Sequence, residues 1–294
     1  MTSPRTVLVT GANQGLGRAL AEGLAAGLRP ADRVLLTGRR ANAVHAAASA
    51  ITASLPHGAR VEPRVLDVRD PSAIDALAAD LGTVDIVFSN ATARMSPDHD
   101  PADQVDAVSE TNNLATTRVL RAFAPRLRPG GRLIVVASAL GTLDKLDPRI
   151  RPRFATAAET TLDAVDDLVA DWRTAVHSGQ ATQRGFGTWL NIPSKVAQVA
   201  AVRALARQRR HIDLPQGRLI AALCPGLIDT DASRPWFQDM SAAQTPAQAA
   251  TWPVELALGE AAAEELATRY GQLVQFGKVI PWRTGVPVPH RATT

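Results

Sequence analysis

Glycines at positions 11, 15 and 17 are the first residues whose type and spacing could do chemistry. They stand in the run Thr10-Gly11-Ala12-Asn13-Gln14-Gly15-Leu16-Gly17, between a β-branched run and an alanine-rich stretch. Gly11 permits a tight turn, Gly15 lets the backbone approach a pyrophosphate, and Gly17 lets a helix pack closely on the preceding strand. The helix N-terminus then offers free N–H groups and a partial positive charge to the phosphates. Three glycines alone are a weak signal, but between a first strand and a first helix they predict a dinucleotide-binding loop.

Two arginines follow the next β-branched run, which reads Thr37-Gly38-Arg39-Arg40 at its end. An NAD-binding loop usually carries an acidic residue there, which bonds the ribose 2′-hydroxyl. A guanidinium suits a 2′-phosphate instead, because it can donate two parallel charged hydrogen bonds. The pair therefore favours NADP(H), with Arg39 as the first choice for the phosphate contact and Arg40 beside it. The alternative is that both arginines lie on a solvated loop.

Short apolar runs alternate with longer alanine-rich stretches along the chain. The predicted strands are Arg5–Thr10, Arg33–Thr37, Val61–Asp67, Val84–Ser89, Arg132–Ala137 and Arg218–Cys224, with a short seventh at Gln272–Phe276. The predicted helices are Leu16–Ala26, Ala41–Ser54, Ser72–Leu81, Gln104–Leu127 and Ser194–Arg209. Nearly continuous apolar strands separated by helices are typical of a parallel sheet covered on both faces. We therefore expect an α/β fold of Rossmann type, with a doubly wound parallel sheet in one domain over residues 1–294.

Two segments fall outside this alternation. Residues 144–187 form an insertion with a helix pattern of its own around Ala157–His177. Residues 281–294 form a proline-containing tail, which we expect to be partly ordered against the body of the protein.

The composition argues against several function classes. The 294 residues carry 32 basic and 28 acidic side chains, which gives a net charge of +4. No stretch approaches the roughly 18 apolar residues of a membrane span, and the first residues lack a signal-peptide pattern. Cys224 is the single cysteine, so no internal disulfide is possible. The histidines lack metal-ligand spacing and no nucleic-acid motif is present. We expect a cytoplasmic protein whose partners include no membrane, nucleic acid or metal.

The order of the remaining motif residues resembles the classical short-chain dehydrogenase/reductase family over nearly the whole chain. Beside the loop at residues 10–17, the matching positions are Asp67-Val68, Asn90-Ala91, Asn112, Ser138, Lys195, and Pro225-Gly226 with Ile228 and Thr230. The resemblance implies that residues 67–68 meet the adenine and that residues 225–230 cap the nicotinamide side. It also implies cofactor contacts for residues 90–91 and Lys195. The long gap between Ser138 and Lys195 is most similar to the carbonyl-reductase branch, in which such an insertion favours monomers.

The chain departs from the family pattern at two positions. Thr92 stands where the family has glycine, which would crowd the cofactor side of that loop. The YxxxK motif of the family reads Asn191-Ile192-Pro193-Ser194-Lys195, so its tyrosine is replaced by Asn191. The only tyrosine, Tyr270, lies just before the last predicted strand, so a shifted register cannot supply it.

The missing tyrosine has a chemical cost. In the family it stabilises the charge on the carbonyl oxygen and protonates it, helped by the lysine ammonium, which lowers its pKa. Asparagine can donate a hydrogen bond but cannot supply a proton near neutral pH. A lost oxyanion donor costs about 3–4 kcal/mol and a lost general acid roughly 10²–10⁴-fold in rate. The remaining candidates are the Ser138 hydroxyl, Ser96 on the loop after the fourth strand, a water held by Lys195, and a phenol of the substrate itself.

Asn191 also has a structural interpretation. Asparagine followed by Ile192-Pro193 resembles a helix N-cap with proline in the first turn, in which case the helix begins later and displaces Lys195. Four apolar residues flank the expected active-site mouth, and they either line a pocket for a large flat substrate or simply pack together. These residues are Trp189, Leu190, Trp236 and Phe237.

The first hypothesis is an NADPH-dependent ketoreductase for a large aromatic ketone, with the proton supplied by substrate or water. Its catalytic positions are Ser138, Lys195, Asn112, Asn191 and Ser96. In lacking the tyrosine, the chain resembles the tyrosine-lacking ketoreductases of angucycline-type polyketide pathways, such as that of simocyclinone. Two alternatives remain open: a cyclase, dehydratase or isomerase that keeps the nucleotide as a structural part, and an inactive NADP(H)-binding regulator.

Overall fold

The computed structural model describes residues 3–283. An eight-stranded sheet forms the centre of this part of the chain. The strand order is β3-β2-β1-β4-β5-β6-β7-β8, and neighbours are parallel except β7 and β8. The strands are β1 (Thr6–Val9), β2 (Arg33–Gly38), β3 (Arg60–Val65), β4 (Val84–Ser89), β5 (Leu127–Val136), β6 (Leu219–Leu223), β7 (Leu273–Gln275) and β8 (Lys278–Ile280). The expected doubly wound sheet is confirmed, whereas the antiparallel edge strand β8 was not predicted.

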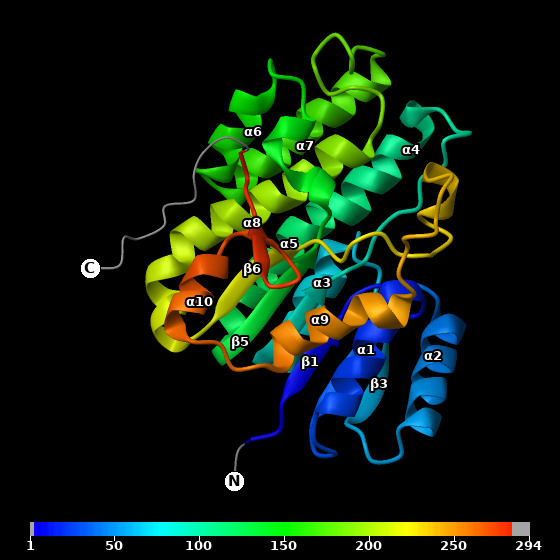
Figure 1. Cartoon of the computed structure of the whole chain (residues 1–294), viewed down its shortest axis with the longest axis vertical. Coiled ribbons are helices and arrows are strands. Elements are labelled where there is room, and N and C mark those ends of the chain that lie inside the picture. The colour runs from blue at the N-terminus through cyan, green and yellow to red at the C-terminus, as the bar shows by residue number, and fades with distance from the viewer. Residues whose placement is uncertain (1–2, 284–294) are drawn as a thin grey trace.

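Helices cover both faces of this sheet (Figure 1). They are α1 (Gly15–Gly27), α2 (Ala41–Ser54), α3 (Pro71–Leu81), α4 (Pro101–Val108), α5 (Ala115–Phe123), α6 (Arg151–Ala158), α7 (Leu162–His177), α8 (Asn191–Asp213), α9 (Pro246–Leu258) and α10 (Ala263–Arg269). The connections through α1 and α5 run towards opposite edges of the sheet, so right-handed crossovers place these helices on opposite faces. Helix α9 packs on α1, whereas α5 packs between α3 and α8. The approach of α9 is close, because a Cβ on Gly27 would lie 2.5 Å from the side chain of Leu258.

The strands are apolar because both of their faces are covered. Every residue of β1 and β6 is buried, which explains their continuous runs of aliphatic residues. The strand order reverses between β1 and β4. In such sheets a crevice opens at the carboxyl ends of the strands at this point, and it is the usual place for a dinucleotide.

The helix predicted over residues 104–127 is interrupted. A π-helical segment, η1 (Ser109–Leu114), separates α4 from α5, and Leu127 already belongs to β5. Single π-helical turns are rare in proteins overall, and those that occur are often found at functional sites. Here the segment carries Asn112 and Asn113, which are 0% and 2% exposed. The apolar periodicity of this stretch is that of an ordinary helix, so the extra residue per turn was not predicted.

The insertion and the tail add to one side of the sheet. The insertion contains two helices, α6 and α7, rather than the one predicted, and both pack on α8. Helices α9 and α10 were not predicted at all. The first residues of the tail are ordered, since Trp282 is 7% exposed and its carbonyl accepts a hydrogen bond from Leu143 N–H at 3.0 Å. Residues 284–294 lie outside the described part of the chain. No helix between residues 3 and 283 is long and apolar enough to cross a membrane.

Candidate cofactor and active site

A cleft of about 800 Å³ lies at the carboxyl ends of the central strands. Every cofactor position predicted from the sequence lines it, except Gly226. These residues are Gly11, Asn13, Gln14, Gly15, Leu16, Gly17, Arg39, Arg40, Asp67, Val68, Asn90, Ala91, Lys195, Pro225, Ile228 and Thr230. Residues from the first, second, third, fourth and sixth strand ends therefore face one cavity.

The glycine loop has the backbone that its sequence predicts. Gly11 and Gly15 have positive φ angles of 62° and 55°, which residues other than glycine rarely adopt. A Cβ on Gly17 would lie 2.4 Å from both the Gly11 carbonyl oxygen and Asn90 Nδ2. The Asn90 amide in turn donates hydrogen bonds to the carbonyls of Thr10 (2.9 Å) and Gly11 (3.2 Å). Gly17 therefore allows α1 to begin directly against the ends of β1 and β4.

The N-terminus of α1 is open to an anion. Its N-cap residue, Gln14, makes no side-chain capping bond, and no acidic residue stands in the first turn. The free N–H groups and the helix dipole therefore face the cleft without an internal partner. This arrangement fits a pyrophosphate.

The adenosine end of the cleft is rich in arginine. Arg39 and Arg40 are exposed at the end of β2 and line the cavity. Arg69, which the sequence did not single out, binds both carboxylate oxygens of Asp67, and these hydrogen bonds lower the Asp67 pKa. The site therefore offers guanidinium groups where a ribose 2′-phosphate would lie, and it fits NADP(H).

Replacing Arg39 by alanine is expected to raise the Kd of NADPH by roughly 10- to 100-fold, the value of a charged hydrogen bond. The Kd of NADH should stay within a factor of about two, because a 2′-hydroxyl has no charge for the guanidinium to bind. Isothermal titration with both cofactors, with Arg40→Ala as the matched variant, measures the two effects. An equal loss for NADPH and NADH would show that Arg39 does not recognise the phosphate.

Asn112 is buried, and its side chain holds both the loop after β4 and the first turn of α8 by hydrogen bonds. Its Oδ1 accepts hydrogen bonds from Ala93 N–H (2.8 Å) and the Thr92 hydroxyl (3.1 Å). Its Nδ2 donates to Ser194 Oγ (3.3 Å) at the start of α8. Thr92 does line the cleft, as expected from the lost glycine, and its hydroxyl is held by Asn112. Asn112 thus ties the loop after β4 to the helix that carries Lys195.

Asn191 is the first residue of α8, and Leu190 holds the N-cap position with no side-chain capping bond. The interpretation of Asn191 as the helix cap is therefore wrong. The reason is local, since Leu190 already has helical φ and ψ angles and the helix begins before the proline. Lys195 consequently lies four residues into the helix, on the same side as Asn191.

Ser138 follows β5 and caps a single 3₁₀ turn, Ala139–Gly141, by accepting a hydrogen bond from Leu140 N–H at 3.2 Å. Its hydroxyl proton makes no hydrogen bond within residues 3–283, so it can be donated to a carbonyl oxygen. The turn packs on α8, because a Cβ on Gly141 would lie 3.0 Å from the Lys195 carbonyl oxygen. The turn that follows Ser138 thus packs on the part of α8 that carries Lys195, and we call this region the active-site corner. Of Ser138, Asn191 and Lys195, only Lys195 lines the cleft.

Lys195 is half-buried at the edge of the cleft. Its ammonium donates a hydrogen bond to Gln198 Oε1 at 2.8 Å. Burial lowers the pKa of Lys195 to about 8 and outweighs the opposing effect of the nearby Cys224. Burial in turn raises the pKa of Cys224, so the thiol stays neutral and forms part of the core.

Ser96 is not brought into the cleft. Its backbone N–H donates to Gln104 Oε1 (2.7 Å), and its hydroxyl pairs with Asp98 in a tight turn. Ser96 is therefore not placed to act as the candidate proton donor, because the loop after β4 folds back on α4. The loop instead contributes Arg94, which forms an ion pair of 2.8 Å with Asp231 of the loop after β6. Neither residue could be predicted as part of the site from the sequence, because the ion pair joins two irregular loops.

Tyr270 is remote from this corner. It is 2% exposed and its hydroxyl donates a hydrogen bond to Asp213 at 2.7 Å, at the last residue of α8. Eighteen residues of helix separate Asp213 from Lys195, a distance of about 27 Å. Burial raises the pKa of Tyr270 above its ordinary range, and the Asp213 carboxylate adds to this. The one tyrosine therefore holds the fold and takes no part in proton transfer.

Aromatic residues stand beside Asn191. Trp189 stacks on Trp236 with ring centroids 5.7 Å apart and planes inclined by 30°. The pair joins the segment before α8 to the loop after β6, and Phe237 beside it is 41% exposed. Leu190 is buried and belongs to the core.

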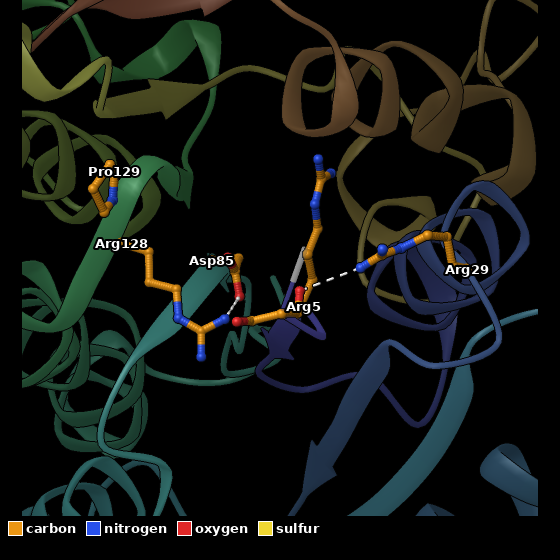
Figure 2. Close-up of a pocket in the computed structure, with 6 residues that line it drawn as sticks. Arg5, Arg29, Asp85, Arg128 and Pro129 are labelled. Carbon is orange, nitrogen blue, oxygen red and sulfur yellow. Dashed lines mark hydrogen bonds and ion pairs between the residues drawn. The ribbon is translucent and has the colours of Figure 1, made fainter. Parts of the chain in front are cut away.

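A second hollow lies at the opposite, amino-terminal edge of the sheet and encloses about 450 Å³. Arg128 forms an ion pair of 3.2 Å with Asp85, as Figure 2 shows by a dashed line. Arg29 donates a hydrogen bond of 3.3 Å to the Ser3 carbonyl oxygen. None of the predicted site residues lines it. In the part of the chain that the structure describes, no group of histidine, cysteine and acidic residues could hold a metal ion.

Comparison with known proteins agrees with this geometry. Residues 5–146 match the family model described as short chain dehydrogenase. Carbonyl reductase [NADPH] 3 of Mus musculus is 30% identical over 292 residues, which cover 95% of this chain and 98% of that protein. Carbonyl reductase [NADPH] 1 of Sus scrofa is 29% identical over 299 residues, 97% of this chain and 96% of the relative.

Solved structures show the same fold. Salutaridine reductase of Papaver somniferum superposes with a TM-score of 0.75 at 19% identity, covering 87% of this chain and 96% of the other. Menthone neomenthol reductase of Mentha piperita has a TM-score of 0.70 at 21% identity, covering 89% and 98%. With a relative 30% identical across nearly its whole length, the chain belongs to the short-chain dehydrogenase family.

Proposed function

We propose that this chain is an NADPH-dependent ketoreductase that reduces a carbonyl of a large aromatic or polycyclic, polyketide-like substrate. The proton comes from the substrate or from water, because Asn191 replaces the tyrosine. The observation that carries the proposal is that Lys195 lines a cleft fitted to NADP(H), while Ser138 is retained at the turn that follows β5. Membership of an oxidoreductase family with NADPH-dependent relatives supports the same conclusion.

When bound, NADPH supplies a hydride to the carbonyl carbon. The residues of the chain then have two tasks, which are to place the carbonyl and to stabilise the charge that develops on its oxygen. The Ser138 hydroxyl and the Asn191 amide are the donors for that oxygen, and Lys195 holds the cofactor ribose and a water. Asn112 acts one step away, by positioning the loop after β4 and the start of α8.

The aromatic class of substrate rests on the Trp189–Trp236 stack beside Asn191. An aromatic contact is worth about 0.5–1.5 kcal/mol beyond area burial. Replacing Trp236 by alanine is therefore expected to lower kcat/KM for α-tetralone by roughly 2- to 12-fold. Trp236→Phe should retain most of the activity, and cyclohexanone turnover should change little in either variant. Equal losses for both ketones would contradict the aromatic assignment.

The partner of this site is a small-molecule ketone, and we propose that the protein acts as a monomer in the cytoplasm. The monomer is supported by α6 and α7, which cover part of α8 from within the same chain. Sedimentation at micromolar concentration tests this, with a single species of 31.1 kDa expected.

The function itself is tested by incubating the protein with NADPH and a panel of aromatic ketones. We expect loss of NADPH absorbance together with formation of the carbinol. Conversion of a substrate without any change in NADPH absorbance would favour the cyclase, dehydratase or isomerase alternative. Tight NADPH binding with no turnover in the whole panel would favour the regulator.

A further inference from the structure

The following inference rests on the proposed function. We propose that Lys195 is the general acid that supplies the proton for ketone reduction, and that Gln198 is the residue that positions the Lys195 ammonium. The proton passes from the Lys195 ammonium to the substrate oxygen through a water in the space that the missing tyrosine leaves. This choice favours water over the substrate as the immediate source.

The helix places the two residues for this route. Asn191 and Lys195 are four residues apart in α8, so their side chains lie on one face a single turn apart. An asparagine side chain is shorter than a tyrosine side chain, and the Asn191 side chain makes no hydrogen bond to any of residues 3–283. Lys195 also lines the cofactor cleft. Lys195 is thus the residue of α8 that both lines the cleft and lies one turn from position 191, where the family has its phenol.

Gln198 fixes the ammonium through a chain of buried hydrogen bonds. Gln198 is 2% exposed and its Nε2 donates to Thr116 Oγ1 at 3.3 Å. The Thr116 hydroxyl donates its own proton to the Asn112 carbonyl at 2.6 Å, so towards Gln198 it can only accept. The Gln198 amide must therefore turn its oxygen to Lys195. An ammonium has three N–H donors, and Gln198 occupies only one of them.

The charges around Lys195 leave it able to release a proton. The acceptor Gln198 is neutral, and Lys195 forms no ion pair in the described part of the chain. Burial lowers the Lys195 pKa to about 8. The carboxylates that line the cleft are each bound to an arginine instead. These pairs are Asp67 with Arg69, Asp229 with Arg234, and Asp231 with Arg94 and Arg234.

Every proton and electron pair in the proposed reduction comes from a group named above. The hydride forms the new C–H bond, the C=O π pair moves to oxygen, and that oxygen takes a proton from the water. The water takes a proton from Lys195 Nζ, which becomes a neutral amine. Solvent reprotonates the amine through the open cleft, and NADPH, once bound, would be the source of the hydride and so of both electrons.

The kinetic test uses α-tetralone and its peri-hydroxy derivative, which carries its own proton beside the ketone. With α-tetralone, kcat should fall as the pH rises above about 8, because the ammonium is lost. Lys195→Arg keeps the charge but cannot give up a proton, so it should lose roughly 10²-fold with α-tetralone and much less with the peri-hydroxy ketone. Equal losses with both ketones, or no loss, would overturn the assignment of Lys195 as the acid.

Two variants of Gln198 separate positioning from packing. In Gln198→Glu the new carboxylate favours the ammonium, so the fall in kcat should move to higher pH. Gln198→Met has similar volume and no acceptor, so kcat should fall without such a move. A pH profile unchanged in both variants would show that Gln198 does not position the acid.

A readout without cofactor or substrate is provided by NMR of lysine-labelled protein, because the chain has only three lysines, Lys145, Lys195 and Lys278. One resonance, absent from Lys195→Arg, should titrate near pH 8. Titration of Lys195 above pH 10 would overturn its role as the acid and leave the ketoreductase proposal standing. Titration near pH 8 without any ketone reduction would overturn the proposed function and, with it, the proton transfer from Lys195.

Discussion

Replacing Asn191 with tyrosine is expected to raise kcat for α-tetralone by about 10²-fold, the value of a direct donor to the developing oxyanion. The new phenol would stand at the first residue of α8, one turn before Lys195. The ammonium there lowers the pKa of a neighbouring phenol and so improves it as an acid. Steady-state kinetics at saturating NADPH measure the effect.

Asn191→Phe is the matched control, because it adds the ring without the hydroxyl. It should give no gain, while the Kd of NADPH stays within a factor of about two in both variants. A gain in Asn191→Phe as large as that in Asn191→Tyr would show that ring packing, not an acid, was missing. No gain in either variant would show that position 191 does not face the reacting oxygen.

Replacing Asp213 with asparagine is expected to lower the free energy of unfolding by about 3–5 kcal/mol. Asp213 is 0% exposed and binds Arg209 (2.9 Å), Arg218 (3.3 Å) and the Tyr270 hydroxyl (2.7 Å). A neutral amide leaves two largely buried guanidinium groups without their anion. Denaturant unfolding followed by circular dichroism measures the loss.

Tyr270→Phe is the matched comparison, since it removes one hydrogen bond and keeps both ion pairs. Its expected cost is about 1–2 kcal/mol, with kcat unchanged within a factor of about two. A loss of activity in Tyr270→Phe at full stability would contradict the purely structural role of this tyrosine.

The glycine loop and Arg39 could be predicted from the residues alone, because each depends on its place at the end of a strand, whereas the other residues that line the cleft were predicted from the family resemblance. Gly11 and Gly15 are predicted to bind a pyrophosphate because glycine permits the tight turn there, and Arg39 is predicted to bind a phosphate because it follows β2. These positions depend on the neighbouring strand and helix, and apolar periodicity locates both. The parallel sheet follows for the same reason.

The active-site corner could not be predicted in the same way, because its contacts join distant segments. Gln198 stands among alanines and valines, and only its contacts with Lys195 and Thr116 distinguish it. Ser96 was misplaced because the turn that Asp98 closes directs its hydroxyl away from the cleft. The start of α8 was also ambiguous, since asparagine before proline fits either an N-cap or a first turn.

The central claim is that a chain without the family tyrosine still transfers hydride to a carbonyl. Incubation with NADPH that carries deuterium at the transferring position of the nicotinamide, followed by mass spectrometry of the product, tests it directly. We predict one deuterium on the carbinol carbon of reduced α-tetralone or a polycyclic analogue, and at least about 10²-fold less of this product when Ser138→Ala and Lys195→Arg are combined. The absence of deuterium in every ketone product, with NADPH bound to the protein, would contradict the claim.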